Sequence, residues 1–232
     1  MQPFCYLWGC IFYFPQMDFS SFFDLLLQNI AAASIWELIA VTFGIISVWF
    51  ARKANILVFP AGILSTSLYI FIFFAAGLYA NMGINLYYTI VSIYGWYNWT
   101  RKTDNRQELP ISWNTKKEQI TGIVLLPIIF CLILGLLWLF GNTGKETILS
   151  YVQVIDALTT AIFVLGMWYL ARKKIENWIF WIVGNLISIP FFFGQGLVFT
   201  SFQFVVFLVL AVMGFFEWKR MYRIASGSNN SK

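Results

Sequence analysis

Aromatic and polar side chains share one face of an otherwise apolar segment, residues 176–190. Trp178, Trp181, Asn185 and Ser188 are spaced three, four and three residues apart, which places them together on an α-helix. Two indoles could enclose a flat ring, more strongly if that ring is cationic, and the amide could both donate to and accept from a hydroxyl or carboxamide. A belt of tryptophans at a membrane surface would explain Trp178, but not the deeper Asn185. The pattern therefore predicts a site for a polar aromatic solute.

Three other apolar segments carry candidate ligands for such a solute. Asn85 and Tyr88 lie three residues apart and share a helical face, although amides and hydroxyls also join membrane helices to one another. Gln203 lies about one turn inside the last apolar segment. Asp156, like Glu37, stands near the start of its segment, where it could cap a helix, attract cations to an acidic mouth, or carry a proton. The predicted binding residues are therefore Trp178, Trp181, Asn185, Asn85, Tyr88, Gln203 and Asp156.

The composition indicates a polytopic membrane protein. Of the 232 residues, 60% are hydrophobic and only 11% charged, and the mean hydropathy is +0.74. Apolar runs of about twenty residues favour transmembrane helices over a β-barrel. The chain has no histidine, its three cysteines form no C-x-x-C pair, and no phosphate-binding glycine loop or nucleophile–base pair is present. We expect no enzymatic activity, no metal and no cofactor.

The apolar runs predict seven transmembrane helices, and composition divides the chain around them. The predicted spans are 34–51, 55–75, 82–99, 120–140, 148–171, 176–193 and 198–218. An N-terminal extension, with Met1 or Met17 as the natural start, precedes the first span and includes a possible interfacial helix. The units are 1–33 (extension), 34–99 (first three spans), 100–119 (loop), 120–140 (linker helix), 148–218 (last three spans) and 219–232 (a tail, disordered from residue 221).

An internal repeat relates the first three spans to the last three. Similar residues recur 119 positions apart, in the pairs Trp49 and Trp168, Gly95 and Gly214, and Trp99 and Trp218. Three spans end on the opposite side from where they begin, so the fourth span must carry the chain back before the second unit. The prediction is two parallel three-helix repeats joined by a linker helix, with a substrate held near mid-membrane between them.

The positive charges predict an orientation. With this span count, every Lys and Arg except Lys145 falls on one side of the membrane. The positive-inside rule then places the C-terminus in the cytoplasm and the N-terminus outside. The net charge of +5 is thus a membrane signal, and we expect no nucleic-acid partner.

Several stretches resemble the PnuC-type nicotinamide riboside transporter family. They are W-E-L-I-A-V-T-F-G (36–44), N-I-L-V-F-P-A-G-I-L-S-T (55–66), N-L-Y-Y-T-I-V-S-I-Y-G-W-Y-N-W (85–99), I-D-A-L-T-T (155–160) and A-R-K-K-I-E-N-W-I-F-W-I-V-G-N (171–185). The family motif W-x-x-W/F-x-x-x-N/D fits Trp178, Trp181 and Asn185. The resemblance, from about 34 to 220, implies a fold like that of the SWEET sugar carriers, a homotrimer and the bacterial cytoplasmic (inner) membrane. It also implies facilitated diffusion of nicotinamide riboside, with trapping by a cytosolic nicotinamide riboside kinase.

The sequence thus favours a passive uniporter for nicotinamide riboside, whose pyridinium carries a fixed positive charge. Thiamine is also cationic, so a carrier of the same fold for thiamine or another vitamin is the first alternative. The second alternative is a receptor or scaffold that transports nothing. A scaffold should show seams of small residues, whereas this chain shows polar faces on several spans.

Overall fold

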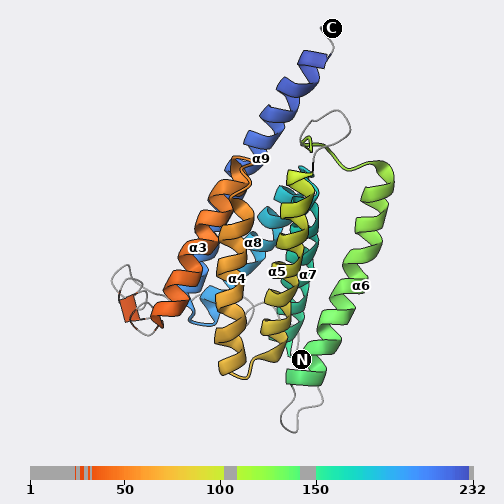
Figure 1. Ribbon diagram of the computed structural model, residues 1–232. Coiled ribbons are helices and arrows are strands. Elements are labelled where there is room, and N and C mark those ends of the chain that lie inside the picture. Colours follow the sequence, from red (N-terminus) through yellow and green to blue (C-terminus); the bar gives the residue numbers. More distant parts are fainter. Residues whose placement is uncertain are drawn as a thin grey trace, which may run out of the picture.

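The computed structural model describes residues 33–101, 109–141 and 150–229, together with residues 24, 27, 28 and 31. Within these ranges the chain is helical, and its one β-type contact is an isolated bridge between Ser112 and Lys174. The predicted N-terminal unit 1–33 lies almost wholly outside the described residues. Figure 1 shows the seven long helices, which are α3 (Ile35–Arg52), α4 (Val58–Ala75), α5 (Tyr79–Thr100), α6 (Lys116–Gly141), α7 (Tyr151–Ala171), α8 (Asn177–Gly194) and α9 (Val198–Asn229).

Six of these seven helices are long and apolar enough to cross a membrane. The remaining one, α5, has 22 residues and is long enough, but Asn81, Asn85, Asn98 and several tyrosines make it less apolar. Asparagines inside a span carry a desolvation cost unless they find partners, so they mark α5 as a helix that packs within the bundle. All seven helices lie where spans were predicted.

The C-terminal tail differs from the prediction. We expected disorder from residue 221, but α9 continues without a break to Asn229. The stretch from Lys219 to Ala225 contains arginine, lysine, methionine and alanine, which favour helix, and no proline or glycine interrupts it. The expectation of disorder came from the polar end of the tail, S-G-S-N-N-S-K, and extended to helix-forming residues that precede it.

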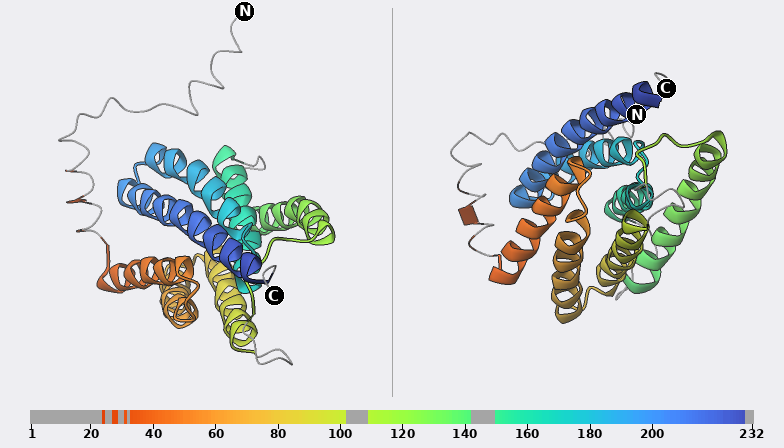
Figure 2. Two further views of the ribbon diagram at one scale, coloured as in Figure 1. Left: turned by 90° about the horizontal axis from the view of Figure 1, so that it is seen from above. Right: turned by 45° about the horizontal axis from the view of Figure 1, so that its top comes forward.

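The helices form two groups of three, with α6 outside them. Within each group neighbours in sequence pack together, α3 on α4 and α4 on α5, then α7 on α8 and α8 on α9. Between the groups, α3 contacts α9 and α5 contacts α7. The view from above in Figure 2 shows α6 at the periphery, where it packs chiefly against α7.

Matched contacts join the two groups at one end of the bundle. The indole nitrogen of Trp99, on α5, donates to the carbonyl of Leu170 at the end of α7 at 3.3 Å. The indole nitrogen of Trp218, on α9, donates to the carbonyl of Ala51 at the end of α3 at 2.9 Å. Both donors and both acceptors are separated by 119 residues. An internal repeat would produce such a reciprocal pair of bonds.

The turns match in the same way. Ala54 and Lys173 follow the first helix of each group with φ of 50° and 53°, and Gly77 and Gly196 follow the second with φ of 72° and 75°. Positive φ is uncommon outside glycine, so its recurrence at Ala54 and Lys173 is a specific similarity between the two groups.

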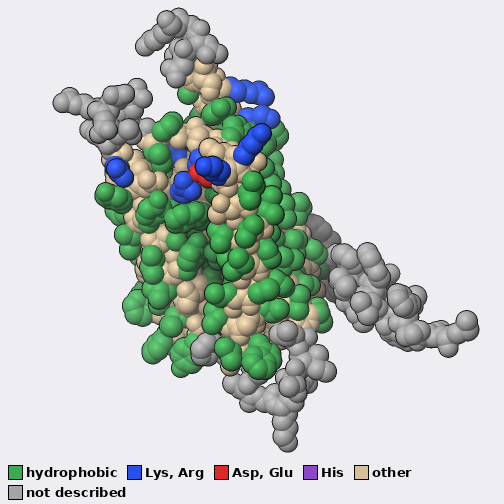
Figure 3. Space-filling view, turned by 90° about the vertical axis from the view of Figure 1, so that its right-hand side faces the viewer, with side chains coloured by type: hydrophobic (Ala, Val, Ile, Leu, Met, Phe, Trp, Pro, Cys, Tyr) green, Lys and Arg blue, Asp and Glu red, His purple; other side chains and the backbone are tan. Residues whose placement is uncertain are grey.

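The surface of the protein agrees with a membrane environment, since Figure 3 shows a broad apolar face with Lys and Arg gathered at one end.

Candidate functional site

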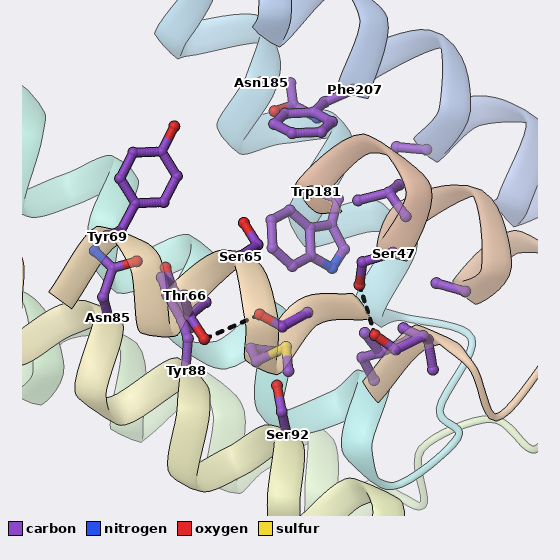
Figure 4. Close-up of a pocket in the computed structure, with 18 of the residues that line it drawn as sticks. Ser47, Ser65, Thr66, Tyr69, Asn85, Tyr88, Ser92, Trp181, Asn185 and Phe207 are labelled. Carbon is purple, nitrogen blue, oxygen red and sulfur yellow. Dashed lines mark hydrogen bonds between the residues drawn. The ribbon is translucent and has the colours of Figure 1, made fainter. Parts of the chain in front are cut away.

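A cavity of about 210 Å³ lies between the two groups of helices. Helices α3, α4 and α5 line one side, α7, α8 and α9 line the other, and α6 contributes no side chain to it. Figure 4 shows Trp181 near its centre, with Asn185 and Phe207 at one end and Tyr69, Asn85 and Tyr88 at another. The cavity therefore depends on both groups of helices at once.

The start of α8, which carries the predicted motif, is fixed by the segment before α6. The backbone of Ser112 donates to the carbonyl of Lys173 at 3.1 Å and accepts from the amide of Ile175 at 3.0 Å. The amide of Asn114 donates to the carboxylate of Glu176 at 2.8 Å. Burial raises the pKa of the Glu176 carboxyl, and this hydrogen bond opposes the rise. These bonds set the position from which α8 enters the bundle.

Glu118 ties α6 to the same place. One of its carboxylate oxygens lies 2.8 Å from the guanidinium of Arg172, and the other lies 2.9 Å from Nζ of Lys174. The hydroxyl of Tyr169 also donates to the carbonyl of Glu118 at 3.2 Å. The linker helix thus takes part in positioning α8 although it does not touch the cavity.

The structure brings six of the seven predicted binding residues to the cavity. They are Trp178, Trp181, Asn185, Asn85, Tyr88 and Gln203. Asp156 is not among the lining residues, and neither is Ser188, which shares the face of the α8 motif. Among the described residues, no Asp, Glu, Lys or Arg lines the cavity, so a cation inside it would be held by aromatic rings and neutral dipoles.

Asn185 is the most informative residue in the cavity wall. Its side chain is 1% exposed, and neither its amide nitrogen nor its amide oxygen has a hydrogen-bond partner among the described residues. Leaving a buried polar group unpaired costs about 1–3 kcal/mol. An amide with both ends unpaired beside an open space has the form of a group prepared for a ligand.

The two tryptophans of the motif have different environments. Trp178 is 1% exposed and packs edge-on against Trp218 with ring centroids 5.6 Å apart. A side-chain carbon at Gly214 would lie 2.5 Å from this indole, so only glycine leaves room for it. Trp181 is half-buried and stacks on Phe163 at 5.2 Å. Trp178 is therefore fixed by packing within the protein, whereas Trp181 has more of its indole surface available to a ligand.

A set of hydroxyl groups on the first three helices was not predicted from the sequence. Ser47 donates to the carbonyl of Val58 at 2.7 Å, and Ser65 donates to the carbonyl of Ala40 at 2.8 Å. Both line the cavity. A hydroxyl that donates its proton to a carbonyl still has lone pairs, so these groups can accept from a ligand hydroxyl.

A sequence signal for one of the missed residues was present. Ser92 lines the cavity and continues the helical face of Asn85 and Tyr88, four residues beyond the tyrosine. Serine in a membrane helix often satisfies itself on its own backbone, so it does not stand out as asparagine does. Thr66 behaves in this way, donating to the carbonyl of Gly62 at 3.0 Å, yet it lines the cavity too.

Comparison with known proteins identifies the family. The model of the nicotinamide mononucleotide transporter family matches residues 34–220, which covers α3 to α8 and the first 23 residues of α9. The chain belongs to this family. Members of this family are membrane transporters and not enzymes, and its relatives are named as transporters.

The similarity to named relatives extends over most of the length of this chain. The nicotinamide riboside transporter PnuC of Escherichia coli is 24% identical over 230 residues, covering 87% of this chain and 94% of its own. The riboflavin/roseoflavin transporter RibM of Streptomyces davaonensis is 25% identical over 190 residues, covering 79% and 84%. A crystal structure of the vitamin B3 transporter PnuC superposes with a TM-score of 0.61 at 20% identity, over 93% of this chain and 97% of that one. The fold is shared, and relatives in the family are named for different vitamins.

Proposed function

We propose that this chain carries nicotinamide riboside across the bacterial cytoplasmic membrane. The observation that carries the proposal is the unpaired amide of Asn185 beside Trp181 in a cavity without charged walls. Nicotinamide riboside offers a carboxamide that matches an amide, a cationic ring that matches an indole, and ribose hydroxyls that match the serines of α3–α5. The names of two PnuC relatives support the same substrate.

The size of the cavity favours a small vitamin. Ligand cavities are commonly about 300–1,000 Å³, and this one is about 210 Å³. Nicotinamide riboside is one ring and one sugar, whereas riboflavin has three fused rings and a ribityl chain. Riboflavin is the second candidate because RibM is a relative of this chain, and thiamine a third.

The proposed transport path lies between two parallel three-helix repeats, α3–α5 and α7–α9, joined by α6. The reciprocal bonds of Trp99 and Trp218 and the matched turns support this arrangement. The proposed orientation places the C-terminus in the cytoplasm, because Arg52, Lys53, Arg172 and the cations of α9 lie at one end. Rocking of one repeat against the other would expose the cavity to each side in turn.

Transport is proposed to be facilitated diffusion, followed by phosphorylation in the cytosol that retains the vitamin. The described part of the chain includes no nucleotide-hydrolysing domain, since its ranges are occupied by the seven helices and their short connections. Assembly as a homotrimer belongs to the same proposal and comes from the family resemblance alone.

Titration calorimetry on the purified protein tests the substrate directly. Nicotinamide riboside, thiamine and riboflavin are each titrated into protein in the same detergent. We expect binding of nicotinamide riboside at least tenfold tighter than that of the other two. Tighter binding of riboflavin or thiamine would reassign the substrate, and binding of none of the three would count against a vitamin site in this cavity. Uptake of labelled vitamin into proteoliposomes then separates a carrier from a receptor, which would bind but not transport.

A further inference from the structure

A second candidate site lies far from the cavity, on the C-terminal extension of α9. An open groove of about 410 Å³ is lined by Phe216, Lys219, Arg220, Arg223 and Ile224. These residues are spaced at helical intervals, so they form one face of a single helix. We refer to them as the α9 basic face. Nothing in the proposed transport function uses them.

The length of α9 places this face at a membrane surface. The helix has 32 residues, so it is about 48 Å long, whereas the hydrocarbon core of a bilayer is about 30 Å thick. A span that begins at Val198 uses about twenty residues and leaves the core near Trp218. Lys219, Arg220 and Arg223 follow immediately, at the depth of the phosphate groups. Figure 1 shows this end of α9 projecting beyond the other helices.

The cations of the α9 basic face lack acidic partners among the described residues. Arg172 and Lys174, at the same end of the bundle, are both paired with Glu118. The salt bridges of the described residues include neither Arg220 nor Arg223, and Lys219 lies over the ring of Phe215 at 5.7 Å. An arginine matches a phosphate with two parallel hydrogen bonds, so two arginines without acidic partners in the described part of the chain, together with a lysine, offer the groups that a phosphodiester requires.

Apolar residues border these charges at both ends. Phe216 and Ile224 are each 63% exposed. Phe216 lies one turn closer to the membrane core than Lys219 and Arg220, where an acyl chain would run. A soluble phosphate would contact the cations and gain nothing from the phenylalanine, whereas a phospholipid would contact both.

We propose that the α9 basic face binds the headgroup of an anionic phospholipid, with its phosphodiester on Lys219, Arg220 and Arg223 and an acyl chain along Phe216. Clusters of basic residues directly beyond a membrane helix attract anionic lipids in this way. The bound lipid would fix the depth and tilt of α9, which also carries Gln203 in the cavity wall.

Native mass spectrometry of the full-length protein in mild detergent tests this proposal. The probes are phosphatidylglycerol, zwitterionic phosphatidylethanolamine and inorganic phosphate, each added to wild type and to the triple variant Lys219→Gln, Arg220→Gln, Arg223→Gln. Wild type is expected to retain phosphatidylglycerol at least tenfold better than phosphatidylethanolamine, and the triple variant is expected to lose that preference. The preference should also decline as salt is raised, because exposed charges are screened.

A charge-matched control separates a site from general attraction. The variant Lys53→Gln, Lys116→Gln, Lys117→Gln removes three cations from the same end of the bundle but outside the α9 basic face, and it should keep the lipid preference. Equal loss in both triple variants would overturn the proposal, as would equal retention of the two lipids by wild type. Displacement of the lipid by millimolar inorganic phosphate would assign the face to a free anion instead. Circular dichroism and nicotinamide riboside binding check that each variant is folded.

Discussion

Replacing Asn185 with leucine should make the empty protein more stable and the binding of its substrate weaker. Leucine has the same number and branching of side-chain heavy atoms as asparagine, but no polar atom. Both ends of the Asn185 amide are buried without a partner, so the substitution should recover about 1–3 kcal/mol of unfolding free energy. For a chain of this size that corresponds to a rise of about 2–4 °C in unfolding temperature for each kcal/mol.

The effect on binding should have the opposite sign. A substrate amide or hydroxyl that meets leucine at this position is left unpaired, which costs about 1–3 kcal/mol. At about 1.4 kcal/mol per tenfold, the affinity should decrease by about 5- to 150-fold. Thermal unfolding in detergent, with and without nicotinamide riboside, and titration calorimetry measure the two changes on one preparation.

Asn98 provides the matched control. Its amide donates to the carbonyl of Ala171 at 2.9 Å, and it does not line the cavity. Asn98→Leu should therefore lower stability by about 1 kcal/mol and leave the affinity unchanged. If the Asn185 variant were instead less stable than wild type, or bound the vitamin equally well, its amide would have a structural role and the reasoning would be refuted.

Four further predictions concern the cavity, the salt bridges of Glu118 and the driving force for transport. Trp181→Ala should weaken binding by up to about 30-fold and Trp181→Phe by less, in calorimetry, because a cation over an indole contributes about 0.5–2 kcal/mol. Gly62→Leu should abolish binding, since a Cβ added there would lie 3.0 Å from the hydroxyl of Ser47, whereas Gly83→Leu, which meets open space, should not. Glu118→Gln should lower the unfolding temperature by a few degrees at low salt and by less at high salt. In proteoliposomes, a potential of 100 mV, inside negative, contributes about 2.3 kcal/mol per charge and should give accumulation of roughly 50-fold that vanishes when the potential is collapsed. Equal final uptake with and without the potential would contradict transport of a cation.

The helices were predictable because the bilayer imposes a strong pattern on the sequence. Runs of about twenty apolar residues and short polar joints located the starts of all seven helices, and the ends of all but α9, within a few positions. The error at α9 has the same origin, because hydropathy reports where the hydrocarbon ends and not where a helix ends. The basic stretch after Trp218 leaves the membrane but remains helical to Asn229.

Among the polar residues of the cavity, the most predictable were those of a type that is costly in a membrane. Asn85, Asn185 and Gln203 stood out for that reason, and all three line the cavity. Ser47 and Ser65 did not, since serine is common in membrane helices and their role follows from packing between helices. Periodicity could also not distinguish Trp178, fixed against Trp218, from Trp181 three residues later, because that difference depends on a helix elsewhere in the chain.

The proposed repeat explains why the cavity is unequal. Counting back 119 residues, Trp181 corresponds to Gly62 and Asn185 to Thr66, and all four line the cavity. Trp178 corresponds to Phe59, and each packs on a tryptophan of the third helix in its own group, Trp218 and Trp99 respectively.

Where the second group has the indole of Trp181, the first group thus has a glycine, which has no side chain. At the position that corresponds to Asn185 the first group has Thr66, whose hydroxyl donates to a carbonyl of its own helix. At these two positions the first group supplies space and the second supplies the recognising groups, while Ser47, Ser65 and Asn85 of the first group line the cavity elsewhere. Neither group lines the whole cavity, so a movement that separates the two groups would also separate the residues that they contribute to it.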